Sequence, residues 1–179
     1  MKAKESYELR LEMAHMHDSF LERLEKAMEE EQFVEASWLC YAIFEQRIAR
    51  IISKHVSKCP KGRRGENEKP VGIATKILCL KKLSKLQYGP YQVFDRELLN
   101  NIDKWCKNRN SLIHGLVSLD YYRKYDEEFK KLATTGVPLV HKLYQEATKV
   151  REWCRDENSF DKFPEIKCRC ERRCIYEEK

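Results

Sequence analysis

Apolar residues recur at spacings of three and four positions along most of this 179-residue chain. That spacing is the period of an α-helix that buries one face. It predicts five helices, over residues 4–30, 33–58, 70–88, 95–114 and 126–155. No segment alternates between polar and apolar residues as an amphipathic strand would. We therefore expect an all-α fold, an up-and-down bundle of about five helices.

Glycine and proline mark where these helices end. The sequence CPKGRRGENEK, residues 59–69, combines glycine, proline and charge and predicts an exposed loop. Gly136 and Pro138 lie inside the fifth predicted helix, so we expect a kink or a break there. The pattern fades near the C-terminus, which indicates one helical domain over 1–156 and a polar, cysteine-containing tail over 157–179.

Hydropathy argues against a membrane protein. No window approaches the roughly 18 consecutive apolar residues of a membrane span. The charged N-terminus, Met1 to Leu11, is followed by no apolar signal core. We expect a cytoplasmic protein with no membrane partner.

Charge is distributed unevenly along the chain. Residues 1–32 are acidic on balance, and residues 50–85 are strongly basic. The basic region could guide a polyanion, or it could be only a solvated helix face. The substrate-binding candidates in it are Lys54, Lys58, Arg63 and Arg64.

The eight cysteines are interpreted as reduced thiols, because no secretory signal precedes them. Those at positions 40, 79 and 106 fall within helical patterns and are expected to fill core volume. A weak alternative is a zinc site near the C-terminus, formed by Cys154, Cys168, Cys170 and Cys174. Their irregular spacing lacks the paired C-x-x-C knuckles typical of zinc sites, so we expect neither a metal nor another cofactor.

Polar residues interrupt the apolar stripe of the fourth predicted helix. The stripe consists of Leu98, Ile102, Trp105, Arg109, Leu112 and Leu116. Asn110 and His114 lie four positions apart on neighbouring rows, with Arg109 about 140° round the helix from His114. The two side chains could reach one atom if Arg109 bent round, or if the helix were irregular near Gly115. The remaining solution is a second copy of the chain across a two-fold axis.

Glu45 occupies a similar place on the second predicted helix, whose stripe consists of Val34, Trp38, Tyr41, Glu45, Ile48 and Ile52. An unpaired carboxylate on such a stripe would be costly, so Glu45 needs a partner such as Arg109 or a backbone donor. A structural ion pair explains Glu45 better than a direct catalytic role.

The sequence RNSLIH, from Arg109 to His114, resembles the Arg-polar-x-x-x-His signature of the HEPN superfamily, late in the fourth of five helices. The resemblance covers roughly residues 4–155. It implies a metal-independent endoribonuclease that acts as a homodimer with the motif helices at the interface, as in toxins and antiviral defence effectors. Arg109 would stabilise charge on the phosphate, His114 would exchange protons, and Asn110 would position the phosphate or orient His114.

Other interpretations remain open. A non-catalytic HEPN-like module would bind a nucleotide or RNA, or dock a partner protein. A structural adaptor would tie Arg109 and His114 into intramolecular pairs. Some HEPN proteins are modified by an antitoxin nucleotidyltransferase on a tyrosine two positions after the histidine; here that position is Leu116. Such a partner is therefore expected only if it acts elsewhere, for example on Tyr121 or Tyr122, which follow closely.

Overall fold

The computed structural model describes residues 19–56, 72–85, 94–115 and 125–156, apart from the side chains of residues 53–56, 83 and 153–156. Every regular element within these ranges is a helix, which confirms the all-α bundle. After a helix over 19–29 come α2 (Phe33–Val56), α3 (Ile73–Lys85), α4 (Arg96–Gly115) and α5 (Tyr125–Asp156). The periodicity predicted the described ends of α2, α4 and α5 to within about three residues, the usual precision of such boundaries.

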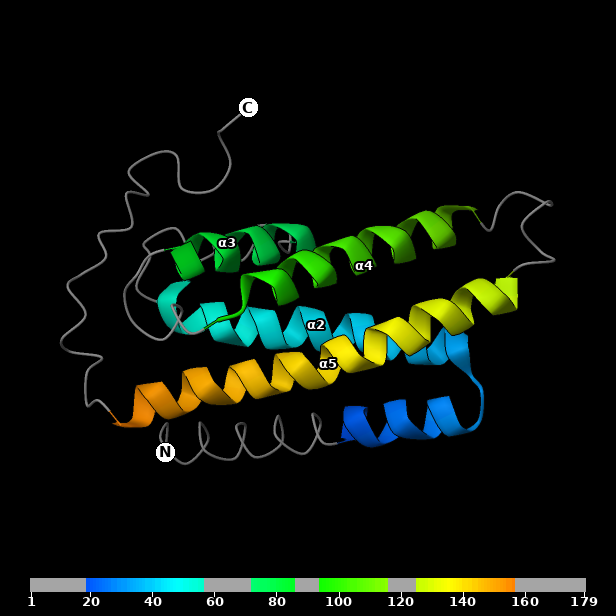
Figure 1. The fold of residues 1–179 in the computed structure, drawn as a ribbon, viewed down its shortest axis with the longest axis horizontal. Coiled ribbons are helices and arrows are strands. Elements are labelled where there is room, and N and C mark those ends of the chain that lie inside the picture. Colours follow the sequence, from blue (N-terminus) through cyan, green and yellow to red (C-terminus); the bar gives the residue numbers. More distant parts are fainter. Residues whose placement is uncertain (1–18, 57–71, 86–93, 116–124, 157–179) are drawn as a thin grey trace, which may run out of the picture.

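The core of the bundle forms around α2. Figure 1 shows α2 between α5 on one side and α3 and α4 on the other, and α2 packs against both α3 and α5. The largest fully buried side chains of the bundle include Phe44 and Ile48 of α2, Leu99 of α4 and Phe129 of α5. The buried face of α4 is the one that the three- and four-residue spacing predicted. The stripe predicted for α2 is buried only at Ile48 and Ile52, because the rows that include Cys40 and Phe44 face the core in place of Trp38.

Polar contacts fix where α4 begins. The Oδ1 atom of Asp95 accepts a hydrogen bond from the backbone N–H of Glu97 at 2.8 Å, which makes Asp95 the N-cap. The backbone N–H of Asp95 donates to the buried carboxylate of Glu146 on α5 at 3.2 Å. Arg96 donates to the carbonyl oxygen of Ser84, near the end of α3, at 3.0 Å. The start of α4 is therefore tied to two other helices.

The direction of α3 departs from strict up-and-down alternation. Because Ser84 near the end of α3 contacts Arg96 at the start of α4, these two helices run antiparallel. The colours in Figure 1 show α4 also running opposite to α2. Consequently α2 and α3, although consecutive in sequence, run in the same general direction. Periodicity reports which face of a helix is buried and carries no information on its direction.

Of the kink or break expected at Gly136 and Pro138, the break is absent, because α5 is one continuous helix through both residues. Proline has no N–H to bond the carbonyl one turn earlier in the helix. Because Pro138 is exposed, that carbonyl lies on the solvent side, where water can bond it. Gly136 is buried against α4. A Cβ atom at this position would lie 2.9 Å from the Trp105 indole. Gly136 thus permits close helix packing and does not end the helix.

Candidate functional site

The residues of RNSLIH lie in the last two turns of α4 and face different directions. Arg109 is buried, with 7% of its surface exposed, whereas Asn110 and His114 are exposed. The helix continues to Gly115 without a change of type, so local irregularity does not bring Arg109 and His114 together. This arrangement agrees with the offset of about 140° expected from helical geometry.

Arg109 is held by two aromatic rings of α2. Its guanidinium carbon lies 4.0 Å from the ring centroid of Trp38 and 4.5 Å from that of Tyr41. Its Nη1 atom donates to Oδ1 of Asn110 at 3.2 Å. The Nε and Nη2 atoms are buried and have no hydrogen-bond partner. Arg109 therefore points toward α2 and does not bend round toward His114.

The charge of Arg109 is compensated by π-electrons and by an amide, without a carboxylate. Within the described residues, no ion pair involves Arg109. Burial lowers the pKa of the guanidinium below its ordinary value, while Tyr41 and Cys106 act to raise it. An arginine starts so far above neutral pH that it stays charged. A buried cation with unsatisfied donors lowers the stability of the fold, and an anion bound nearby would reduce that cost.

His114 lies in the last turn of α4, where a helix end favours positive charge. Among the described residues it makes no hydrogen bond and no ion pair. Asn110 lies one turn earlier on the same exposed side and keeps its amide N–H₂ group as a donor for a ligand. One chain thus presents His114 and Asn110 to solvent together, while Arg109 contacts Asn110 and points away from His114.

Glu45 is paired with Lys76 and not with Arg109. The Nζ atom of Lys76 on α3 lies 2.8 Å from Oε1 of Glu45, and both side chains are partly buried. The partner that the carboxylate requires on the apolar stripe thus comes from α3. This ion pair is the structural alternative to a catalytic role for Glu45.

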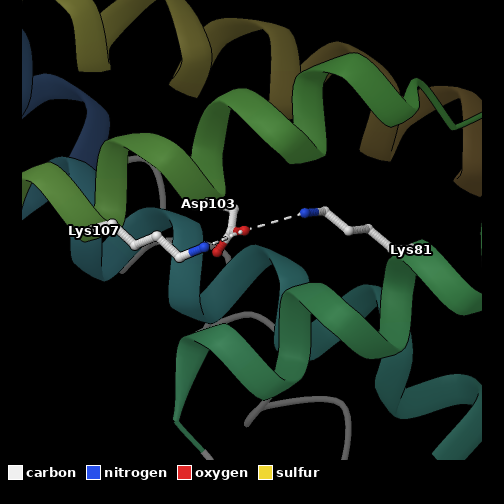
Figure 2. Close-up of polar contacts among 3 residues, drawn as sticks. All are labelled: Lys81, Asp103 and Lys107. Atoms are coloured by element: carbon white, nitrogen blue, oxygen red, sulfur yellow. Dashed lines mark hydrogen bonds and ion pairs between the residues drawn. The ribbon is translucent and has the colours of Figure 1, made fainter. Parts of the chain in front are cut away.

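Part of the basic region is already neutralised by acidic neighbours. Lys81 of α3 and Lys107 of α4 both donate to Oδ2 of Asp103, at 3.3 and 3.1 Å, and Figure 2 shows the carboxylate between them. Lys82 and Lys85 are exposed on α3. The four substrate-binding candidates, Lys54, Lys58, Arg63 and Arg64, lie outside the residues whose side chains are described.

Asp103→Asn should lower the free energy of unfolding by about 1 kcal/mol at pH 7, as expected for a partly buried ion pair. Partial burial acts to raise the pKa of this carboxyl. The hydrogen bonds from Lys107 and Lys81 outweigh burial, so the net pKa lies below its ordinary 3.8. A carboxyl with a lowered folded-state pKa stabilises the protein above its unfolded pKa and loses that contribution as the pH falls through the folded value. The difference between variant and wild type, measured by urea unfolding, should therefore shrink below about pH 4.

Glu128→Gln is the matched control, because its ion pair with Lys131 is more exposed on both sides than that of Asp103 with Lys81. It should change the free energy of unfolding by well under 1 kcal/mol. An Asp103→Asn protein as stable as wild type at pH 7 would show that the contact between the two lysines and Asp103 contributes nothing.

Cys40, Cys79 and Cys106 are buried in the core and form no disulfide, as the helical pattern predicted. Burial raises the pKa of both Cys40 and Cys106 to about 12, so these thiols stay protonated at neutral pH and are poor nucleophiles. No group of metal-ligating side chains occurs in the part of the chain that the structure describes. The alternative zinc ligands Cys154, Cys168, Cys170 and Cys174 lie outside the described side chains.

Sequence reasoning missed the environment of Arg109. Trp38 and Tyr41 were assigned to the apolar stripe of their helix as core residues, but Trp38 is 53% exposed. The sequence does predict that Trp38 and Tyr41 share one helix face, because they are three positions apart. Nothing in a single sequence pairs that face with Arg109 on another helix.

The fold and the site define an all-α bundle with a buried, aromatic-stacked arginine. No family model, curated protein or solved structure matches the chain. None of the helices in the described ranges has both the length and the apolar character needed to cross a bilayer.

Proposed function

We propose that this protein is a metal-independent endoribonuclease that acts as a homodimer. The observation that carries the proposal is the state of Arg109, a buried guanidinium without a carboxylate partner and with two unsatisfied N–H-bearing atoms. An aliphatic residue would serve a bundle better at this place on the apolar stripe. Local features that cost stability without structural benefit are typical of functional sites. The resemblance of RNSLIH to the HEPN signature supports RNA as the substrate.

In the proposed reaction the ribose 2′-OH is the nucleophile. His114 accepts its proton, the O2′–P bond forms, and the P–O5′ bond breaks to leave a 2′,3′-cyclic phosphate. The imidazolium can return the proton to the departing O5′. Arg109 stabilises the charge on the phosphate oxygens, and Asn110 donates a hydrogen bond to one of them. DNA lacks the 2′-OH and should resist cleavage.

The geometry of one chain favours a site that two chains share. Arg109 faces α2 while His114 faces solvent, and α4 shows no irregularity that would reorient either. A two-fold axis beside α4 would place His114 of one copy near Arg109 of the other. The proposed biological role is a toxin or an antiviral defence effector. An antitoxin, such as a nucleotidyltransferase, would have to act elsewhere than on the position of Leu116.

A second candidate function is a non-catalytic module that binds a nucleotide or RNA, or docks a partner protein. The burial of Arg109 favours the form that docks a partner protein, because a guanidinium with 7% exposure in the single chain has little direct access to a phosphate. Such a module would leave RNA intact whatever its oligomeric state.

The purified protein should cleave single-stranded RNA at the same rate with and without EDTA, because the proposed chemistry uses a histidine and an arginine in place of a metal. Product analysis should find 2′,3′-cyclic phosphate ends, and size-exclusion chromatography with light scattering should give the mass of a dimer. The control substrate is a DNA oligonucleotide of the same sequence, which should stay intact. Loss of cleavage in EDTA, restored by Mg²⁺, would contradict the proposed mechanism.

A further inference from the structure

Trp38 is the most exposed large apolar side chain in the described part of the molecule. Its exposed fraction is 53%, and the only other such side chain there is Leu78, at 43% on α3. Trp38 covers the guanidinium of Arg109, whose carbon lies 4.0 Å from the centre of the indole ring. An exposed tryptophan placed against a buried cation needs an explanation that scattered surface apolar residues do not.

The indole is one of two aromatic rings that contact the Arg109 guanidinium, and these three groups form a cation–π stack. Because Trp38 and Tyr41 are one turn apart on α2, the Arg109 guanidinium approaches both rings, at 4.0 and 4.5 Å. Cation–π contacts of this kind fix the orientation of an aromatic ring before any ligand binds. The stack thus supplies a preorganised flat surface beside unsatisfied N–H donors, and nearby Asn110 is exposed.

We propose that Trp38 is a stacking platform for one nucleobase of single-stranded RNA, next to the phosphate that Arg109 and Asn110 bind. The inference rests on the proposed function for the class of ligand. Stacking on an aromatic ring together with charge on the adjacent backbone is the general mode of single-strand binding. Trp38 would be a positioning residue, and since every base has a π-face, it would tolerate all four bases.

RNA suits this surface better than a second copy of the chain docking through Trp38. An apolar contact would bury Trp38 and leave the cation of Arg109, whose Nε and Nη2 atoms are already buried, without an anion nearby. A nucleotide covers the indole with its base and brings a phosphate, which can accept from the exposed amide of Asn110 and compensate the charge of Arg109 at short range. The chemistry of the site therefore matches a ligand that is flat on one side and anionic on the other.

The test measures binding of a fluorescein-labelled 2′-O-methyl RNA oligonucleotide, which cannot be cleaved because its 2′ oxygens are blocked. Trp38→Ala should weaken binding roughly 5- to 150-fold, the range for loss of one stacked base. Trp38→Phe, which keeps an aromatic face, should bind with an affinity between those of wild type and Trp38→Ala. Leu78→Ala is the matched control, since it removes a similarly exposed apolar side chain from α3, and it should bind as wild type does.

Tryptophan fluorescence gives an independent readout. An unlabelled 2′-O-methyl RNA should quench the emission, and the quench should be smaller when Trp38→Phe is added. Both proteins carry Trp153→Phe, which removes the third tryptophan and leaves only Trp105, buried with 4% exposure, beside Trp38. Circular dichroism and light scattering establish that the variants keep their fold and their mass.

The possible outcomes distinguish the stacking inference from the ribonuclease proposal. Equal affinity of wild type and Trp38→Ala would overturn the stacking inference and leave the ribonuclease proposal standing. The Trp38→Ala protein could lose its dimeric mass and still bind RNA as tightly as wild type does, when both are compared at concentrations where both are monomeric. That result would assign Trp38 to the contact between copies. Binding that depends on Trp38, with no cleavage of unmodified RNA, would support stacking and refute only the ribonuclease. A wild-type protein that binds no RNA would refute both.

Discussion

His114→Ala should abolish RNA cleavage while leaving the helical fold intact. Removing a positioned acid or base typically lowers the rate by a factor of about 10²–10⁴. The structural cost should be small, because His114 is exposed and its interaction with the helix end contributes only about 0.3–1 kcal/mol. Cleavage of a labelled single-stranded RNA measures the first effect, and thermal unfolding by circular dichroism measures the second.

Arg109→Ala should have the same catalytic effect for a different reason, the loss of the fixed cation at the phosphate. Its truncation leaves space between Trp38 and Tyr41, so Arg109→Met is the companion variant. Methionine fills an irregular apolar gap without a charge and should retain the fold while also failing to cleave. A purified His114→Ala protein that cut RNA at the wild-type rate would show that the ribonuclease interpretation of RNSLIH is wrong. The docking module would then take its place.

Mixing the two single variants tests whether the site is shared between chains. In a heterodimer of Arg109→Ala and His114→Ala chains, one cleft could combine the intact arginine of one chain with the intact histidine of the other. Equal mixing should then restore about a quarter of the wild-type rate, since half the dimers are mixed and each has one complete cleft of two. No recovery would place each site within one chain, against the geometry that directs Arg109 and His114 apart.

The helices could be predicted from the sequence because their signals are local. The α4 helix was expected over 95–114 and lies at Arg96–Gly115, since Asp95 is a good N-cap and Gly115 disfavours continuation. The sequence left a kink or a break open at Pro138 and did not decide for the observed continuity of α5. That continuity depends on which side of the helix Pro138 faces and on the packing of Gly136 against α4, and both are tertiary facts.

The candidate site divides in the same way. The rotation per residue along α4 predicted that Arg109 and His114 would point apart. The place of Glu45 on an apolar stripe predicted that its carboxylate would need a partner. The identity of the partners could not be predicted, since Lys76 for Glu45 and Trp38 for Arg109 come from other helices. The direction of α3 had to be known before Lys76 could be placed beside Glu45, and hydrophobic periodicity does not specify direction.

Trp105→Ala should produce the largest loss of stability, lowering the free energy of unfolding by about 3–5 kcal/mol in urea titrations. The indole is buried, packs edge-to-face on Phe44 with ring centroids 5.2 Å apart, and donates from Nε1 to the carbonyl oxygen of Leu132 at 2.8 Å. It therefore joins α4 to both α2 and α5. Trp105→Phe should cost less, because it keeps a ring on Phe44 and because the Thr135 hydroxyl still donates to the same carbonyl.

Gly136→Ala tests the fit between α5 and that indole. Alanine favours a helix by about 1 kcal/mol over glycine, but its Cβ would lie 2.9 Å from Nε1 and Cε2 of Trp105, and overpacking a core typically costs about 1–3 kcal/mol. The variant should be destabilised on balance. In the Trp105→Phe background the ring is smaller and lacks the outer part of the indole, so the same substitution should cost less than it does beside Trp105. Residues in direct contact are expected to couple, so the two changes in the free energy of unfolding should not simply add. If they do add, Trp105 does not determine the requirement for glycine at position 136.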